Sequence, residues 1–279
     1  MFILIFDTYG GLCNQMYDIQ AAINYCLAYN IQFSFRYASL RNPHNLYQWF
    51  DIPFEELFNT SIFTQFSLYK HYSSLNCNAK NTHNFNNPIR AIEWVDINRA
   101  ILPQLEYVQK QYIVLRQFWS TPGNIIEQYN MFSIITPCKK LRDIVQSLIG
   151  KHLPIKYNLI NYRYEEDFNS HFKIENPLKL HDIIHHITFK QPDLPIYIAA
   201  NDVTSIPPNL LSPSVDKFEN IIYKTEGNTC NLNFEEAAFV DFMIGKNAQQ
   251  IYGHHKSSFS VLLNSNHATN NYYDLEMEK

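Results

Sequence analysis

Charged residues are scarce in this 279-residue chain, at 17% of the sequence, and the formal net charge is only −4. Because no basic patch stands out, the sequence does not support a nucleic-acid partner. Hydrophobic residues, in contrast, make up 46% of the chain and aromatic residues 15%, which is ample material for a core. We therefore expect an ordered protein of one large domain or two small ones.

Paired cysteines and long apolar runs are also missing. The five cysteines are widely spaced and include no CxxC pair, so we expect reduced thiols and neither a disulfide framework nor a zinc ribbon. No apolar run approaches the roughly 18–20 residues that a membrane span needs. The apolar start, 1–6, has no basic region and stops at Asp7, which is too short for a signal peptide. These absences predict a complete, soluble, cytoplasmic chain without a membrane span.

What is present is an alternation of strand and helix patterns, which favours parallel sheets. In the second half we expect helices over 177–187, 234–244 and from 258 onward. The expected strands are 156–162, 195–199, 220–223 and 250–252. A helix over 137–149 that stops at Gly150 suggests a hinge at 150–154, so we expect domains 1–150 and 151–279.

The first half is harder to interpret between its two ends. The run 1–6 predicts a first buried strand, followed by a second at 31–36 and a later one at 112–115. Short helices are suggested at 54–58 and 62–63. The asparagine-rich stretch 76–87 has little to bury and predicts a surface loop.

Two adjacent glycines, Gly10 and Gly11, follow the first strand. They permit a tight turn and a close approach of the backbone to a ligand. Apolar residues at a spacing of three to four then predict an amphipathic helix over 12–27. The dinucleotide GxGxxG fingerprint and the phosphate-binding GKS/T loop are both absent, so the turn by itself indicates a nucleotide or sugar site only weakly.

The stretch 157–167 holds the strongest candidate for chemistry. An apolar strand ends there in Arg163, and the acids Glu165, Glu166 and Asp167 follow. Ligands of open α/β sheets bind at the carboxyl ends of strands, and an arginine there offers a planar charged fork for a phosphate or carboxylate. The alternative is a surface strand end at which Arg163 pairs with one of the acids.

Asp241 lies alone inside an apolar helix pattern, where a carboxylate is costly unless a donor satisfies it. That donor could be a neighbouring backbone loop, or a hydroxyl or ring N–H of a ligand.

The stretch 253–263 runs from a strand through a glycine turn into a helix that starts with serines. Free N–H groups at this helix start make an anion site, to which the hydroxyls of Ser257 and Ser258 would add donors. An ordinary serine N-cap is the alternative.

Together, four motifs resemble the GDP-fucose-dependent O-fucosyltransferase families, including the plant-type branch, and more distantly the α-1,2- and α-1,6-fucosyltransferases. They are, in the family's order, Gly10-Gly11-Leu12-Cys13-Asn14-Gln15, the strand that ends in Asn161-Tyr162-Arg163, the strand Ile196-Tyr197-Ile198-Ala199, and the stretch from Ala238 to Leu263. The resemblance covers the ends of the N-terminal half thinly and most of 156–263.

The resemblance implies a GT-B architecture, in which two Rossmann-like domains face each other across a cleft. It implies inverting, metal-independent transfer of fucose from GDP-fucose to a glycan or protein hydroxyl, with no cofactor. The N-terminal domain would be the acceptor side. In agreement, the chain lacks an Asp-x-Asp pair, and its adjacent histidines at 185–186 and 254–255 lack the carboxylate spacing of a metal site.

The resemblance also assigns roles to individual residues. Arg163 would hold the β-phosphate, helped by Ser257, Ser258 and the helix end, in an electrostatic stabilisation of the leaving GDP. Asp241 would contact the nucleoside, with Phe259 beside it. Asn14 and the turn of Gly10 and Gly11 would approach the phosphates or the sugar from the other domain.

Asn161 departs from the pattern because these enzymes usually carry a histidine there. An amide can donate a hydrogen bond but cannot take a proton. Two alternatives therefore remain open: a related transferase for another nucleotide-deoxysugar, such as rhamnose, and a catalytically inactive protein that binds nucleotide sugars.

Overall fold

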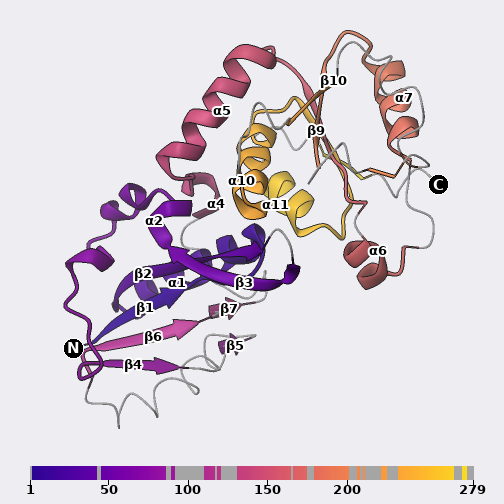
Figure 1. The fold of residues 1–279 in the computed structure, drawn as a ribbon. Coiled ribbons are helices and arrows are strands. Elements are labelled where there is room, and N and C mark those ends of the chain that lie inside the picture. Colours follow the sequence, from indigo (N-terminus) through magenta and orange to yellow (C-terminus); the bar gives the residue numbers. More distant parts are fainter. Residues whose placement is uncertain are drawn as a thin grey trace. The chain divides into compact units, whose positions relative to one another are not determined.

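The computed structural model describes residues 2–42, 45–85, 89–91, 110–116, 118–120, 131–164, 166–174, 179–200, 206–207, 210, 221–224, 232–266 and 272–274. The chain divides into two compact units, Met1–Lys139 and Lys140–Lys279. Each unit is built on a sheet of five described strands (Figure 1). Helix α5 (Lys139–His152), which the sequence analysis assigned to a first domain ending at residue 150, lies almost entirely in the second unit.

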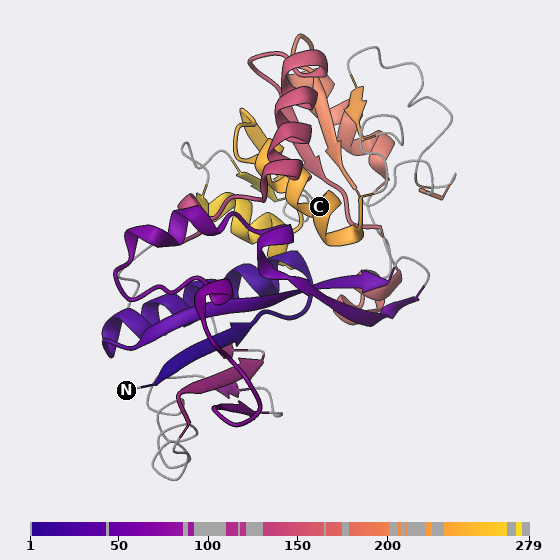
Figure 2. The ribbon, with the colours of Figure 1, turned by 60° about the vertical axis from the view of Figure 1, so that its left-hand side comes forward.

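Unit 1 contains a mostly parallel sheet with the strand order β3-β2-β1-β6-β4. Its strands are β1 (Ile3–Asp7), β2 (Gln32–Asn42), β3 (Asn45–Pro53), β4 (Thr82–Phe85) and β6 (Tyr112–Arg116). Helix α1 (Leu12–Ala28) connects β1 to β2, which pair in parallel, whereas the long β3 runs antiparallel to β2 (Figure 2). The smaller elements are α2 (Phe54–Leu57), η1 (Thr60–Gln65), η2 (Tyr72–Ser74), β5 (Ile89–Ala91), β7 (Phe118–Ser120) and α4 (Met131–Ile134).

Stacked aromatic rings hold α2 against the sheet of unit 1. The Phe35 ring of β2 lies 4.7 Å from that of Phe54, and Phe54 lies 4.7 Å from Phe58, both pairs stacked. Phe63 of η1 packs against the same group. Such pairs contribute about 0.5–1.5 kcal/mol each beyond the area they bury. Part of the aromatic abundance of the sequence is therefore used in this core.

Two strands of unit 1 differ from the sequence-based expectation. The stretch 76–87, expected to be a surface loop, contains β4, which pairs in parallel with β6 at the edge of the sheet. β3 lies in a region for which no strand was predicted. An edge strand is specified by its backbone pairing, and the residues of β4 are only partly buried or exposed, so no apolar pattern marks it.

Unit 2 has an all-parallel described sheet with the order β10-β9-β8-β11-β12. Its strands are β8 (Asn158–Asn161), β9 (Ile196–Ala199), β10 (Ile221–Tyr223), β11 (Gln250–Gly253) and β12 (Tyr272–Asp274). Its helices, besides α5, are α6 (Glu166–Phe172), α7 (Leu180–Lys190), α10 (Phe234–Gly245) and α11 (Ser258–Asn266). The predicted strands and helices of this half are thus confirmed, with small shifts of their ends.

Helices cover both faces of the unit 2 sheet, as the pleat requires of apolar strands. Ile160 and Ile198 lie in one cluster with the buried side of α7. Tyr157 and Tyr197 point to the opposite face of the sheet, which α10 covers. There Tyr157 donates a hydrogen bond to the Ile244 carbonyl, and Tyr197 donates one to the Asp241 carboxylate. In Figure 1, α7 is accordingly well separated from α10 and α11.

The strand order of unit 2 creates a natural binding edge. The chain starts at the central β8, continues through β9 and β10 on one side, and then returns to add β11 and β12 on the other. The connections that follow β8 and β11 therefore lead in opposite directions, which leaves a crevice at the carboxyl ends of these strands. Unit 1 also has β2 and β3 on one side of its first strand and β4 and β6 on the other, but there the outer strand β4 precedes β6 in the chain.

Gln15 fixes the turn that follows β1. Its buried side chain donates hydrogen bonds to the carbonyls of Gly10 (2.8 Å) and Ser39 (2.7 Å). It accepts them from the Thr8 hydroxyl (2.8 Å) and the Ser39 N–H (3.1 Å). The glycine turn is thereby tied to β2, which explains a glutamine directly after Asn14 in structural terms.

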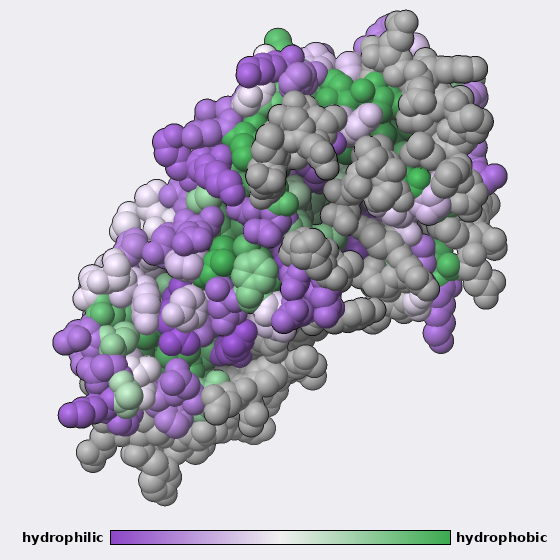
Figure 3. All heavy atoms as spheres, in the orientation of Figure 1, coloured by the Kyte–Doolittle hydropathy of each residue, from purple (hydrophilic) through white to green (hydrophobic). Residues whose placement is uncertain are grey.

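The distribution of hydrophobic residues over the surface and along the helices bears on whether the chain could contact or cross a membrane. On the face shown in Figure 3, hydrophilic and hydrophobic residues are interspersed over the described part of the chain. Within the described residues, no helix combines the length and the apolar character that a membrane crossing requires.

Two helical glycines give a matched test of this packing. We expected Gly150 to end α5, and this was wrong, because the helix continues to His152 and stops just before Pro154. A Cβ on Gly150 would meet nothing within 4 Å, whereas a Cβ on the buried Gly245 would lie 2.8 Å from Leu263 Cδ1 and 3.2 Å from Leu159 Cδ1. Gly150→Ala should therefore raise the free energy of unfolding by roughly 0.5–1 kcal/mol.

Gly245→Ala should lower the same free energy by about 1–3 kcal/mol, because both leucines are buried and cannot swing away. Urea denaturation followed by circular dichroism measures both changes. Equal effects of the two substitutions would contradict this account of the packing of α10.

Gln15 and Asn14 form a second matched pair. Gln15→Leu keeps the buried volume but removes a donor from two carbonyls, so it should destabilise the protein by about 2–4 kcal/mol. Asn14 is half-buried, and its side chain has no hydrogen-bond partner among the described residues. Asn14→Ala should therefore shift stability by less than about 0.5 kcal/mol in the same denaturation experiment. A large loss with Asn14→Ala would refute the assignment of the structural role to Gln15.

Candidate functional site

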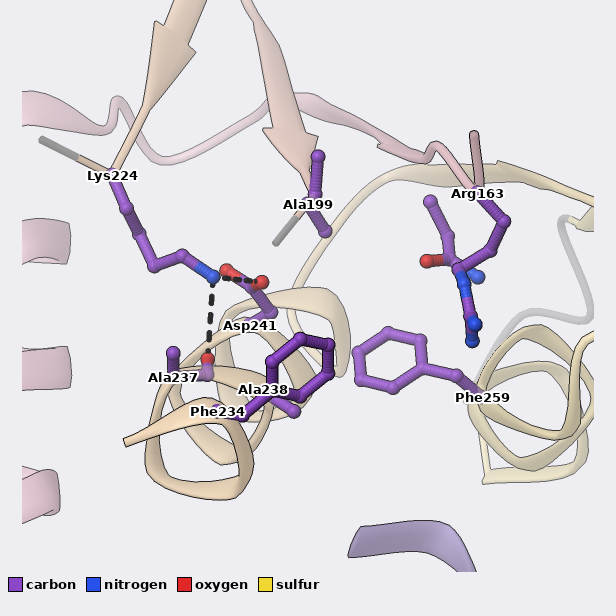
Figure 4. A pocket seen from close by; sticks show the side chains of 10 residues that line it. Arg163, Ala199, Lys224, Phe234, Ala237, Ala238, Asp241 and Phe259 are labelled. Carbon is purple, nitrogen blue, oxygen red and sulfur yellow. Dashed lines mark hydrogen bonds and ion pairs between the residues drawn. The ribbon is translucent and has the colours of Figure 1, made fainter. Parts of the chain in front are cut away.

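A pocket lies along the carboxyl ends of β8, β9 and β10 in unit 2. Residues that end or follow these strands line one side, and α10 and α11 line the other (Figure 4). The lining residues are Asn161, Arg163, Ala199, Ala200, Lys224, Phe234, Ala237, Ala238, Asp241 and Phe259. Four residues proposed from the sequence, Asn161, Arg163, Asp241 and Phe259, are thus brought together in one place.

Arg163 stands at one end of this pocket, just beyond β8. Its guanidinium carbon lies 4.8 Å from the ring centroid of Phe168, a cation–π contact with a buried residue of α6. The His254 ring in turn meets Phe168 edge-on at 5.3 Å. These contacts hold the planar fork of Arg163 at the switch point. The acids that follow Arg163 have side chains outside the described residues.

Asn161 links the end of β8 to the start of α11. Its Nδ2 donates hydrogen bonds to the hydroxyl oxygens of Ser257 (3.1 Å) and Ser260 (2.6 Å), and all three side chains are buried. Ser257 Oγ also lies 3.5 Å from the Ser260 N–H, in the pattern of a helix N-cap. The serine N-cap that the sequence left open is therefore present, and Asn161 supports it.

The two serines proposed as anion ligands differ in their settings. Ser257 is buried beside Asn161, with its oxygen accepting hydrogen bonds, so its own hydroxyl proton is directed elsewhere. Ser258 is exposed and does not line the pocket. Ser260, which the sequence analysis did not single out, takes part in the network instead. Its position three residues after the N-cap is the signal that could have identified it.

Lys224 and Asp241 occupy the other end of the pocket. Asp241 accepts a hydrogen bond from the Tyr197 hydroxyl (2.7 Å), and its second oxygen forms an ion pair with Lys224 Nζ. Both charged side chains are more than nine-tenths buried. Burial raises the pKa of Asp241, while Lys224 and Tyr197 oppose that rise. The isolated carboxylate that the sequence singled out is therefore satisfied by protein donors.

Apolar surface separates these two ends. Figure 4 shows the rings of Phe234 and Phe259 between Lys224 on one side and Arg163 on the other. β9 lies between β8 and β10 in the sheet, so the two cations follow strands that are about 9–10 Å apart, twice the usual spacing. An elongated ligand with two polar ends and a flat middle suits such a pocket.

Lys224 and Phe234 were not predicted from the sequence. Lys224 directly follows a strand of three residues, and Phe234 is the first residue of a helix; neither position has a distinctive local motif. Their relevance depends on strand order, which places β10 two strands from β8.

In unit 1, the two glycines of the predicted motif serve different purposes. Gly10 adopts φ +92°, a conformation that favours glycine. Gly11 leaves room for Arg41, because a Cβ there would lie 3.0 Å from the guanidinium Nη2. The side chain of Asn14 borders the same turn, with Nδ2 3.2 Å from the Cβ position of Gly10.

The histidines next to the candidate site already have protein contacts. His255 pairs with Asp274 at 3.0 Å, and the His254 ring accepts a hydrogen bond from the Lys256 N–H. Over the described residues, no group of three or more histidine, cysteine or acidic side chains is arranged to hold a metal ion.

No model of a known protein family and no curated protein sequence matches this chain. Solved structures do resemble it over almost its whole length. One is the crystal structure of POFUT1 in complex with GDP-fucose, with a TM-score of 0.68 and 11% identity, which covers 98% of this chain and 97% of that chain.

The NodZ α-1,6-fucosyltransferase soaked with GDP-fucose matches with a TM-score of 0.55 and 11% identity, over 99% of this chain and 96% of that one. The fucosyltransferase NodZ from Bradyrhizobium matches with a TM-score of 0.55 and 12% identity, over 95% and 92%. The chain therefore has the mixed α/β GT-B fold of these fucosyltransferases, as the resemblance of its motifs predicted.

Proposed function

We propose that the protein is a glycosyltransferase that moves fucose from GDP-fucose to a hydroxyl group of a glycan or protein acceptor. The pocket of unit 2 carries this proposal, because it combines an arginine at a strand switch point with an apolar middle and a polar far end. The fold supports it as well, since the similar structures include complexes with GDP-fucose.

Arg163 would act on the phosphates. In an inverting transfer, the acceptor oxygen attacks C1 of fucose on the face opposite the β-phosphate. The bond from C1 to the phosphate oxygen breaks, its electron pair leaves with GDP, and the hydroxyl proton passes to water. Negative charge then grows on the β-phosphate, where a fixed guanidinium and the N-terminus of α11 stabilise it without a metal ion.

The Asn161 network would prepare the second donor. Because the oxygen of Ser257 accepts a hydrogen bond from Asn161, its O–H can point away from that amide toward an anion. Asn161 in this role is a positioning residue. Phe259 at the same helix start would border the donor. Ser258 lies outside this pocket, so its contact with the donor remains a prediction of the resemblance, as do those of Asn14, Gly10 and Gly11.

One observation favours a second candidate function. The Asn161 amide donates to two serines and cannot accept a proton, so it supplies no general base. A catalytically inactive protein that binds nucleotide sugars would need no base. A related transferase for another nucleotide-deoxysugar, such as rhamnose, is the third candidate, since the same phosphate contacts would serve it.

Ligand-induced stabilisation tests the donor. GDP at about 100 times its dissociation constant should stabilise the folded protein by roughly 2.7 kcal/mol, or about 5–10 °C in melting temperature. EDTA should leave this shift unchanged, because the phosphate contacts come from the protein. If no nucleoside diphosphate raises the melting temperature, both the transferase and the binding-protein proposals fail.

Substitution of Arg163 tests the phosphate contact. Arg163→Ala removes the charge and Arg163→Lys removes the planar fork. Each should therefore slow the transfer reaction, measured as formation of GDP from GDP-fucose, by roughly 10²–10³-fold. The assay follows GDP by chromatography with a panel of glycan and peptide acceptors. Arg142→Ala on α5 is the matched control, because Arg142 does not line the pocket. Near-normal turnover by Arg163→Ala would assign the phosphate to another residue.

A further inference from the structure

We propose that Lys224 reads the base of the donor nucleotide together with Asp241, and selects a base in which a carbonyl oxygen adjoins a ring N–H. Guanine has this edge. The inference rests on the proposed function and adds a specificity-determining residue to it. Among the motifs from which the resemblance was drawn, none includes Lys224.

The position of Lys224 in the sheet is the first step. Arg163 follows β8 and Lys224 follows β10, with β9 between them, so the two cations lie at opposite ends of the pocket. If the phosphates lie against Arg163, the base of an extended nucleoside diphosphate reaches the end held by Lys224 and Asp241. The rings of Phe234 and Phe259 then lie between the two ends, where they offer apolar contacts to the nucleoside.

The hydrogen-bonding capacity of Lys224 is the second step. An ammonium group carries three hydrogens. Within the described residues, Lys224 Nζ pairs with the Asp241 carboxylate and lies 3.4 Å from the Ala237 carbonyl oxygen. One hydrogen therefore remains for an acceptor atom of a ligand. Its side chain is 8% exposed and lines the pocket, so that hydrogen is presented in a largely dry site.

Asp241 supplies the hydrogen-bond acceptors that complement the donor of Lys224. A carboxylate offers about four lone-pair sites, of which Tyr197 takes one on the first oxygen and Lys224 takes one on the second. Two sites remain, which is the number that two neighbouring N–H donors on a base would use. Tyr197 and Lys224 also hold the carboxylate in place before the ligand arrives. Binding therefore costs little side-chain conformational entropy at Asp241.

A donor beside an acceptor selects among bases. Guanine presents an oxygen at position 6 and N–H groups at positions 1 and 2, which match Lys224 and Asp241 in that order. Adenine reverses the pattern, with an amino group where guanine has oxygen. It would place N–H against an ammonium and a ring nitrogen against a carboxylate. Sites that leave buried polar groups unpaired in this way discriminate strongly against the wrong ligand.

The test uses nucleotides that differ from GDP at this edge of the base. Isothermal titration of the full chain compares GDP, ADP and the diphosphate of 6-thioguanosine, which keeps the N1 hydrogen and the 2-amino group but replaces the 6-oxygen with sulfur, a weak hydrogen-bond acceptor. We expect GDP to bind about 10- to 100-fold more tightly than the 6-thio analogue, the size of one well-placed base contact. ADP should bind more weakly still. Because these comparisons need only the unmodified protein, they stand even if a variant folds poorly.

The substitution Lys224→Met tests whether Lys224 causes the preference for GDP. In this variant the preference for GDP over the 6-thio analogue should shrink to about threefold or less, and Lys224→Gln, which keeps an N–H donor, should retain part of it. Lys156→Met removes an exposed cation from unit 2 and should leave the preference intact.

The two possible failures are distinguishable. If the unmodified protein binds GDP without preferring it, or Lys224→Met keeps the full preference, this inference is overturned and the proposed function stands. If no nucleoside diphosphate binds, both are overturned.

Discussion

Parallel pairing around a central first strand is the constraint on which the arrangement of unit 2 depends. Once β8 has formed, the chain adds β9 and β10 on one side and β11 and β12 on the other, so all five carboxyl ends share one edge. Right-handed crossovers are nearly obligatory for such strands, and they place helices on both faces. Arg163 beyond β8, Lys224 beyond β10 and the start of α11 beyond β11 thereby meet along that edge, although they are far apart in the sequence.

The Asn161 network shows how this edge is held together. Its amide reaches the N-cap residue Ser257 and Ser260 of α11, and so joins the first strand of the unit to the last described helix. A histidine at this position, as in the families that the motifs resemble, could exchange a proton, whereas an amide only donates or accepts hydrogen bonds. The amide at this position therefore connects strand and helix and supplies no acid–base group. The proposed transfer would depend on positioning and electrostatics rather than on proton abstraction at this point.

The sequence predicted β8 to β11 and the helices α7, α10 and α11 because their apolar residues repeat with the proper period, but it did not predict α6 or β12. It failed for β4, whose residues are at most partly buried, and for the end of α5, where Gly150 meets open space and imposes no stop. Within the site, Arg163 and Asp241 were identifiable because each interrupts an apolar run. Lys224 and Ser260 were not, since their significance arises only when distant strands and helices come together.

Two buried ion pairs at strand ends lead to the last point. Asp7, at the end of β1, accepts two hydrogen bonds from Arg36, at 2.9 and 2.5 Å, and Asp241 pairs with Lys224 at the end of β10. Burial raises the pKa of both carboxyl groups, because moving these charges out of water is costly. Buried pairs seldom stabilise a protein more than apolar residues of similar size would. The Asp7 pair can be explained as a clamp between β1 and β2. The Lys224 pair lines an accessible pocket and keeps unused donor and acceptor capacity, so its desolvation cost is better explained by recognition of a ligand than by stability.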